Sequence, residues 1–135
     1  TIQAQILSLM KELQNETGMA IIYISHDLGV IANMVDKVIV MYLGKIVERS
    51  SVSNLFASPL HPYTKALIDS IPRIGKTKRE KLFSIKGVVP SPLENRNGCD
   101  FYSRCEKAIN NICNKKVPNL LEINKDHEVR CFLYK

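Results

Sequence analysis

Long apolar runs are missing from this sequence of 135 residues. The longest, Met19–Ile24 and Val38–Leu43, fall far short of the roughly 20 apolar residues that a membrane-spanning helix needs, so we expect no transmembrane segment. The N-terminus also lacks the basic stretch and following apolar stretch of a signal peptide. The chain begins with Thr1, and its first residues already follow a helical pattern. This favours a sequence that starts partway through a larger fold.

Phosphate-binding motifs are missing as well. The pattern G-x-x-x-x-G-K-[ST] occurs nowhere, so the chain has no glycine-rich loop whose backbone amides could cradle a phosphate. Leu-Ser-Gly-Gly is absent too, and no hydrophobic run ends in Asp-Glu. We therefore expect no nucleotide hydrolysis by this polypeptide alone.

Positive charge is scarce in the first half of the chain and gathers in the second. The formal net charge is +6, yet residues 1–72 hold five Lys and Arg against six Asp and Glu. Residues 73–135 hold 14 against seven, with the densest run at residues 73–81. A basic run can bind nucleic acid. This run has no interleaved aromatic residues for base stacking, which favours a solvated linker.

Hydrophobic periodicity divides the first 49 residues into helices and strands. Thr17-Gly18 ends the first helix, and Ser25 or Asp27 can cap the second. Gly44 marks a tight turn between two strands. A buried strand joined through helices is typical of a layered α/β domain. The predicted order is helix 1–16, strand 19–24, helix 28–35, strand 37–43 and strand 45–49.

The pattern changes after residue 50. Pro59-Leu-His-Pro62 is a turn-rich joint between two short predicted helices, at residues 51–58 and 63–71. Beyond the basic run, the prolines, asparagines and cysteines predict a small, loop-rich module with little core. We therefore predict two domains, residues 1–57 and residues 58–135.

Ser25-His26-Asp27 follows the predicted strand 19–24 directly. The carboxyl end of a buried strand is where α/β sheets place ligands, and an imidazole there could donate a hydrogen bond to a phosphate oxygen. The trio could equally be a polar cap on a strand-to-helix turn, and spacing alone leaves both interpretations open. Three consecutive residues cannot form a serine-hydrolase triad, because they cannot present its chain of hydrogen bonds.

All four cysteines lie in the last 37 residues, with the spacing C-x5-C-x7-C-x17-C. Four thiolates complete the ligand set of Zn²⁺ or of a [4Fe–4S] cluster. Zinc sites usually use closely paired cysteines, whereas these wide gaps favour the larger cluster, and Arg104 and Arg130 beside the cysteines could offset its charge. Disulfides and free thiols are further alternatives. The candidate ligands are Cys99, Cys105, Cys113 and Cys131.

Three blocks of this sequence resemble one protein family. Residues 3–49 resemble the segment after the D-loop in ABC-transporter ATPases. Residues 58–72, with His61-Pro62-Tyr63, resemble the His-Pro-Tyr block of the oligopeptide/dipeptide branch, and residues 98–105 its cysteine-bearing extension. The resemblance implies an α/β fold: the C-terminal part of an ABC ATPase (P-loop NTPase) domain, followed by a small, loop-rich, cysteine-ligated extension.

The resemblance also implies roles for single residues. His26 corresponds to the switch-loop histidine, which contacts the γ-phosphate of ATP and helps to position the attacking water. The four cysteines correspond to ligands of a [4Fe–4S] cluster, with zinc as the alternative. The expected role of the cluster is structural, and redox sensing is the alternative role. Around these cysteines the sequence departs from the family pattern in two places. The gap from Cys105 to Cys113 is longer than the family's, and Glu106 stands where the family often has proline. His61 is expected to be structural.

The function implied is the ATP-binding, energy-coupling subunit of an ABC importer for peptides, or for nickel or related solutes. ATP and Mg²⁺ would bind in the complete subunit, paired with a second ABC ATPase subunit at the cytoplasmic face of the membrane. Permease subunits, and indirectly a substrate-binding protein, are the other expected partners, and no nucleic acid is expected. The alternative is a free-standing metal-cluster module with a regulatory or nucleic-acid-binding role, for which salt-dependent DNA or RNA binding is the test.

Overall fold

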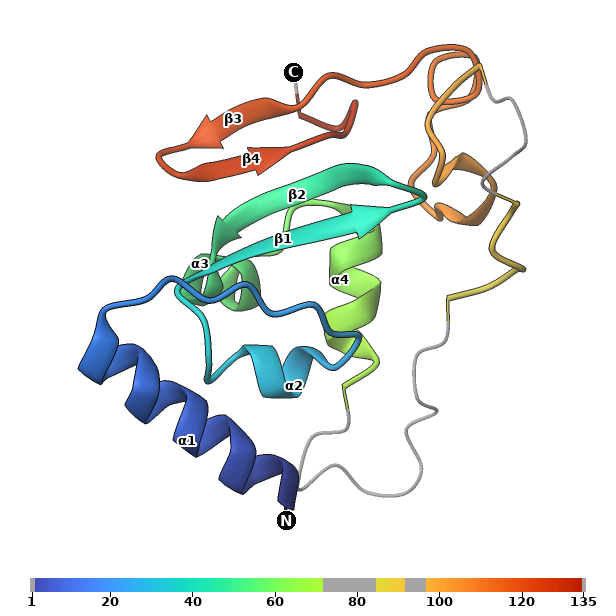
Figure 1. The fold of residues 1–135 in the computed structure, drawn as a ribbon. Coiled ribbons are helices and arrows are strands. Elements are labelled where there is room, and N and C mark those ends of the chain that lie inside the picture. The colour runs from blue at the N-terminus through green and yellow to red at the C-terminus, as the bar shows by residue number, and fades with distance from the viewer. Residues whose placement is uncertain (1, 72–84, 92–96, 135) are drawn as a thin grey trace. The chain divides into compact units, whose positions relative to one another are not determined.

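The computed structural model describes residues 2–71, 85–91 and 97–134 (Figure 1). The chain forms two compact units, residues 1–36 and residues 37–135. The predicted boundary between residues 57 and 58 stays a prediction. The predicted basic linker, residues 73–81, lies outside the described residues. Every helix in the described ranges is too short or too polar to cross a bilayer.

The first unit contains helix α1 (Ile2–Thr17) and the short helix α2 (Leu28–Ile31). Gly18 ends α1 as predicted: its φ is 68°, and its amide donates to the carbonyl of Gln14 at 2.9 Å. The carboxylate of Asp27 caps α2, accepting from the amide of Gly29 at 2.9 Å. The predicted helix 28–35 is shorter than expected, because i to i+3 bonds tighten the chain into turns at residues 32–34.

The predicted strand 19–24 is wrong. Residues 19–24 contain no strand, and the side chains of Ile22 and Ile24 are 90% and 98% exposed. A strand needs a neighbour to bind its backbone amides and carbonyls. The sheet in the described residues is built from four strands that all begin at or after Lys37, so none of them pairs with this segment.

The second unit is built on one antiparallel sheet with the strand order β1-β2-β4-β3. The hairpin predicted around Gly44 is confirmed, with positive φ at Leu43 and Gly44. The second hairpin was not predicted, because its strands are short and polar. The strands are β1 (Lys37–Tyr42), β2 (Lys45–Ser51), β3 (Leu121–Asn124) and β4 (His127–Val129).

Two capped helices follow β2. Helix α3 (Val52–Ala57) begins where the Ser51 hydroxyl accepts from the amide of Asn54 at 3.2 Å. Helix α4 (Pro62–Asp69) has Pro62 at its first position and the His61 ring as its cap. Both confirm predicted helices, with ends shifted by a residue or two.

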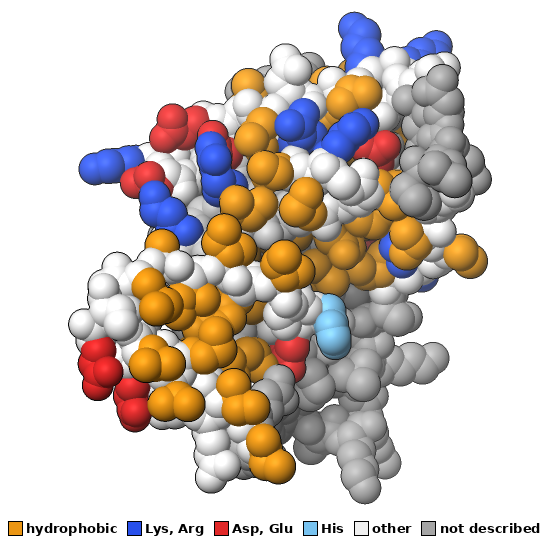
Figure 2. Space-filling model, viewed as in Figure 1, with side chains coloured by type: hydrophobic (Ala, Val, Ile, Leu, Met, Phe, Trp, Pro, Cys, Tyr) orange, Lys and Arg blue, Asp and Glu red, His pale blue; other side chains and the backbone are white. Residues whose placement is uncertain are grey.

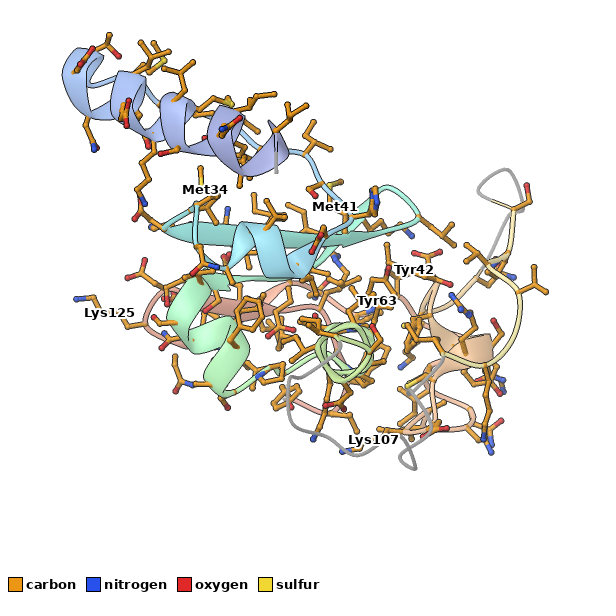
Figure 3. All side chains as sticks on the ribbon, turned by 90° about the horizontal axis from the view of Figure 1, so that it is seen from below. Met34, Met41, Tyr42, Tyr63, Lys107 and Lys125 are labelled. Atoms are coloured by element: carbon orange, nitrogen blue, oxygen red, sulfur yellow. The ribbon has the colours of Figure 1, made fainter. Side chains whose placement is uncertain are left out.

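The core of the second unit lies on one face of the sheet. Alternate residues of β1 (Val38, Val40 and Tyr42) are buried, whereas Ile39 and Met41 between them are about half exposed. Helix α3 contacts β1 and β2 and contributes Leu55, which is fully buried. Figure 3 shows Tyr42 beside Tyr63 of α4, with ring centroids 4.8 Å apart. Hydrophobic side chains also reach the surface over much of the face seen in Figure 2.

Candidate functional site

The four predicted cysteine ligands all lie in the second unit, and all are free thiols. Cys99 and Cys105 stand on either side of the short 3-10 helix η1 (Tyr102–Arg104), and Cys131 follows β4. Cys113 is buried and the other three are half-buried. Disulfides, one of the alternatives from the sequence, are not formed in this structure.

A close backbone contact joins two of these cysteines. The amide of Cys99 donates to the carbonyl oxygen of Cys113 at 2.7 Å. A Cβ atom added at Gly98 would lie only 2.4 Å from that same oxygen. Only glycine lets the two chain segments approach this closely. The sequence Gly98-Cys99 therefore brings the first and third cysteines to one place.

Backbone amides hydrogen-bond to all four sulfur atoms. The amide of Ile109 donates to the Cys113 Sγ at 3.4 Å. The other three cysteines each accept from the amide two residues further along the chain, at Phe101, Lys107 and Leu133. Amide-to-sulfur hydrogen bonds are among the features that tune metal-bound thiolates. The backbone is thus shaped around the sulfur atoms as well as around the side chains.

The four thiols share one neighbourhood. Burial, together with the nearby sulfurs of Cys113, Cys131 and Cys105, raises the pKa of Cys99 to about 11. Burial likewise raises the pKa of Cys105 and of Cys131. Within the described residues, however, no three His, Cys, Asp or Glu side chains are arranged to hold a single metal ion.

Arg104 and Arg130 brace the cysteine segments through backbone carbonyls. Arg104 donates from Nε to Lys86 O at 3.1 Å and from Nη2 to Ile85 O at 3.2 Å. Arg130 donates from Nε to Ile46 O at 2.8 Å and from Nη1 to Pro118 O at 3.1 Å. Their planar guanidinium groups thus connect the segments around Cys105 and Cys131 to neighbouring segments of the same polypeptide.

A fully buried carboxylate, Glu48, lies in β2 and was not predicted from the sequence. Its Oε1 accepts from Leu60 N and from His127 Nε2, each at 2.8 Å, and its Oε2 accepts from His61 N at 2.9 Å. Strict alternation would not place both Val47 and Glu48 inside. An irregularity in the pairing of β1 with β2, next to this position, breaks the alternation.

His61 is buried beside this carboxylate. Its Nδ1 accepts from the amide of Tyr63 at 3.1 Å, which caps α4. Burial lowers the pKa of His61 to about 4, although the charge of Glu48 opposes the shift. The ring is therefore neutral at physiological pH and remains available as a cap.

His26 lies in the first unit, on the turn that precedes α2, and its side chain is exposed. Its neighbours form the turn: the Ser25 hydroxyl accepts from the amide of Asp27 at 3.0 Å, and Asp27 caps α2. The strand that was expected to end at this turn is not formed, so a catalytic role for His26 stays a prediction.

Comparison with known proteins gives a consistent result along the chain. Residues 47–113 match the family described as "Oligopeptide/dipeptide transporter, C-terminal region". The chain is 48% identical over 134 residues to the oligopeptide transport ATP-binding protein AppD of Bacillus subtilis, covering 99% of this chain and 40% of AppD. It is 44% identical to AppF of the same organism, covering 99% of this chain and 41% of AppF. Against the dipeptide transport ATP-binding protein DppF of Haemophilus influenzae, the identity is 39%, covering 98% and 40%. The chain therefore spans about two fifths of the length of these curated relatives.

Proposed function

The chain belongs to the oligopeptide/dipeptide transporter family, as a C-terminal part of an ATP-binding subunit, and we propose that it serves in the energy-coupling step of a peptide ABC importer. The observation that carries this proposal is the similarity along 97–99% of the chain to proteins named as peptide transport ATP-binding proteins. Similarity of that extent argues against a free-standing metal-cluster module.

In the complete subunit, ATP and Mg²⁺ would be held by motifs that are absent from these 135 residues. This chain would contribute His26, whose exposed imidazole can reach a ligand and donate a hydrogen bond to the γ-phosphate. A second ABC ATPase subunit and permease subunits would be its partners, with a substrate-binding protein acting indirectly. The subunit would lie at the cytoplasmic face of the membrane, and peptides are the proposed cargo, with nickel or related solutes as the alternative.

The second part of the proposal is that Cys99, Cys105, Cys113 and Cys131 hold a [4Fe–4S] cluster. Two features of these residues fit that group. The donor set is four thiols in one neighbourhood, and backbone amides hydrogen-bond to the sulfurs. When bound, such a cluster supplies a rigid covalent junction between chain segments, which adds folding free energy to a module with a small core.

The test uses the protein as its gene encodes it, because catalysis requires the phosphate-binding motifs. We expect measurable ATP hydrolysis by that protein and none by the 135-residue chain. Replacing His26 with alanine is expected to lower the rate by about 100-fold, the usual loss when one group that stabilises the transition state is removed. Asn33→Ala, an exposed position in the same unit, is the matched control. An unchanged rate in the His26→Ala protein would contradict the catalytic assignment.

The cluster is tested separately, by iron, acid-labile sulfide and zinc analysis under anaerobic conditions. We expect equal iron and sulfide contents, and loss of both in Cys113→Ser. Zinc without sulfide would instead identify the alternative.

A further inference from the structure

The carboxylate of Glu48 is cut off from solvent, and its hydrogen-bond partners come from separate parts of the chain. Two are backbone amides of residues 60 and 61, in the segment that leads into α4. The third is His127, at the start of β4, whose side chain is 4% exposed. Glu48 therefore ties β2, the His-Pro-Tyr segment and β4 together at one point. We call the contact between its Oε1 and His127 Nε2 the Glu48–His127 pair.

The direction of this hydrogen bond follows from the surroundings. A carboxylate that already accepts from two backbone amides is an acceptor, so the Nε2 atom of His127 donates to it. A buried carboxylate that loses one of its donors suffers the cost of an unpaired charge in a place without water. Breaking the pair is therefore expected to open the structure locally at β4.

Cys131 lies two residues after the end of β4, so the contacts of β4 and of the residues next to Cys131 hold it in place. The ladder between β2 and β4 consists of two residue pairs, Glu48 with Val129 and Arg49 with Glu128. Beyond the ladder, the amide of Arg130 donates to Val47 O at 2.8 Å and its side chain donates to Ile46 O and Pro118 O. The hydroxyl of Tyr134 donates to Leu60 O at 3.0 Å. In Figure 1 the hairpin of β3 and β4 lies along β2, as the sheet order requires.

The other three cysteines also have backbone contacts within residues 98–116. Cys99 N bonds Cys113 O at 2.7 Å, Cys105 N bonds Tyr102 O at 3.2 Å, and Cys113 N bonds Ile109 O at 2.9 Å. These three contacts do not involve β4, and the segment meets β2 through the ion pair of Lys45 with Asp100 at 2.9 Å. Cys131 thus joins the other three from a distant part of the sequence, and its position depends on what holds β4 in place.

We propose that the Glu48–His127 pair positions Cys131 for the four-cysteine centre, so that breaking the pair releases Cys131 and leaves Cys99, Cys105 and Cys113 in place. The inference rests on the cysteine centre proposed above. It assigns Glu48 and His127 as positioning residues, which act on the centre through the backbone of β4. Burial raises the pKa of Cys131, and the charge of Glu48 adds to that rise.

The experiment compares how fast each cysteine is alkylated by N-ethylmaleimide, read by peptide mapping in the protein as its gene encodes it. In Glu48→Gln, which keeps the size of the side chain but loses its charge, we expect alkylation of Cys131 to rise about tenfold because local opening becomes more frequent. The other three cysteines are expected to change by less than about twofold, so each molecule contains its own control. Glu128→Gln, on the same strand, should leave all four rates unchanged, because that carboxylate pairs with the side chain of Arg49.

A second pair of variants keeps the test decisive if Glu48→Gln fails to fold. His127→Phe keeps a ring of similar size but has no donor, so it should expose Cys131 in the same way. His127→Gln places a donor at a similar reach, and we expect it to restore the alkylation rates of the unmodified protein. A role of His127 in packing alone would not produce this rescue.

A spectroscopic measurement reports on the bound group directly. If iron and sulfide are present, oxidised Glu48→Gln and His127→Phe should show the electron paramagnetic resonance signal of a three-iron cluster, as Cys131→Ser should. If iron and sulfide are absent, the cluster proposal fails, while the alkylation pattern still decides the positioning role. Equal acceleration at all four cysteines, or none at Cys131, would overturn the inference.

Discussion

The backbone of Gly98 lies against the carbonyl oxygen of Cys113, at a distance that leaves no room for a Cβ atom: one would stand 2.4 Å from the oxygen. Gly98→Ala is therefore expected to push the two segments apart and to destabilise the fold by about 1–3 kcal/mol, the usual cost of overpacking. Chemical denaturation of the protein as its gene encodes it, followed by circular dichroism, measures the change. Gly29→Ala serves as the control, because its Cβ would meet only a side-chain oxygen of Asp27 at 3.2 Å. An equal or smaller loss in Gly98→Ala than in the control would contradict this reading of the contact.

The buried ring of His61 predicts a loss of stability in acid. Its pKa is about 4 in the folded chain, against 6.5 for an unperturbed histidine, so between these values the unfolded chain binds a proton that the folded chain does not. The contribution of His61 to the free energy of unfolding is therefore fully present above about pH 6.5. It is lost as the pH falls towards 4, and the loss is at most about 3 kcal/mol. Denaturation midpoints measured between pH 7 and pH 4 follow this loss. His61→Asn keeps a capping side chain that does not titrate, and we expect it to remove this part of the pH dependence; an unaltered slope would assign the acid sensitivity to other groups.

The local elements could be predicted from the sequence because short-range chemistry determines them. Gly18 ends a helix, Asp27 caps the next, and Gly44 turns a hairpin, and each acts through its own backbone or its nearest neighbours. The α/β expectation holds only as a mixture of helices with an antiparallel sheet, since residues 19–24 have no strand beside them. An apolar segment forms a strand only when a neighbouring strand pairs with its backbone amides and carbonyls.

The candidate site divides in the same way. The four cysteines could be named as candidate ligands from their spacing, and their role as a ligand set stays a prediction. Glu48 could not be found, because its partners at residues 60, 61 and 127 meet it only through tertiary folding. An acidic residue in a strand usually indicates a solvated face, so only the fold shows that this one points inward.

The guanidinium group of Arg130 leads to a prediction about geometry rather than charge. Its two hydrogen bonds to Ile46 O and Pro118 O need a planar fork, which lysine lacks. Arg130→Lys keeps the charge but leaves a half-buried carbonyl without its donor, so we expect a loss of about 1–3 kcal/mol in the free energy of unfolding. Arg49→Lys alters an exposed ion pair with Glu128 and should cost clearly less in the same denaturation assay. Equal losses would show that charge, not the fork, is what matters at residue 130.

The exposed segment 19–24 predicts how the 135-residue chain behaves on its own. Ile22 and Ile24 are 90% and 98% exposed in a stretch that has the composition of a buried strand. Unpaired apolar backbone of this kind recruits other chains, so the isolated chain should self-associate at micromolar concentration. Ile22→Lys combined with Ile24→Lys adds repelling charges and is expected to shift the chain towards monomer in sedimentation velocity. Val88→Lys, at an exposed apolar position of the second unit, is the control and should leave association unchanged. If the double variant associated as strongly as the unmodified chain, the contact surface would lie elsewhere, and the half-exposed Ile39 and Met41 of β1 would be the next positions to replace.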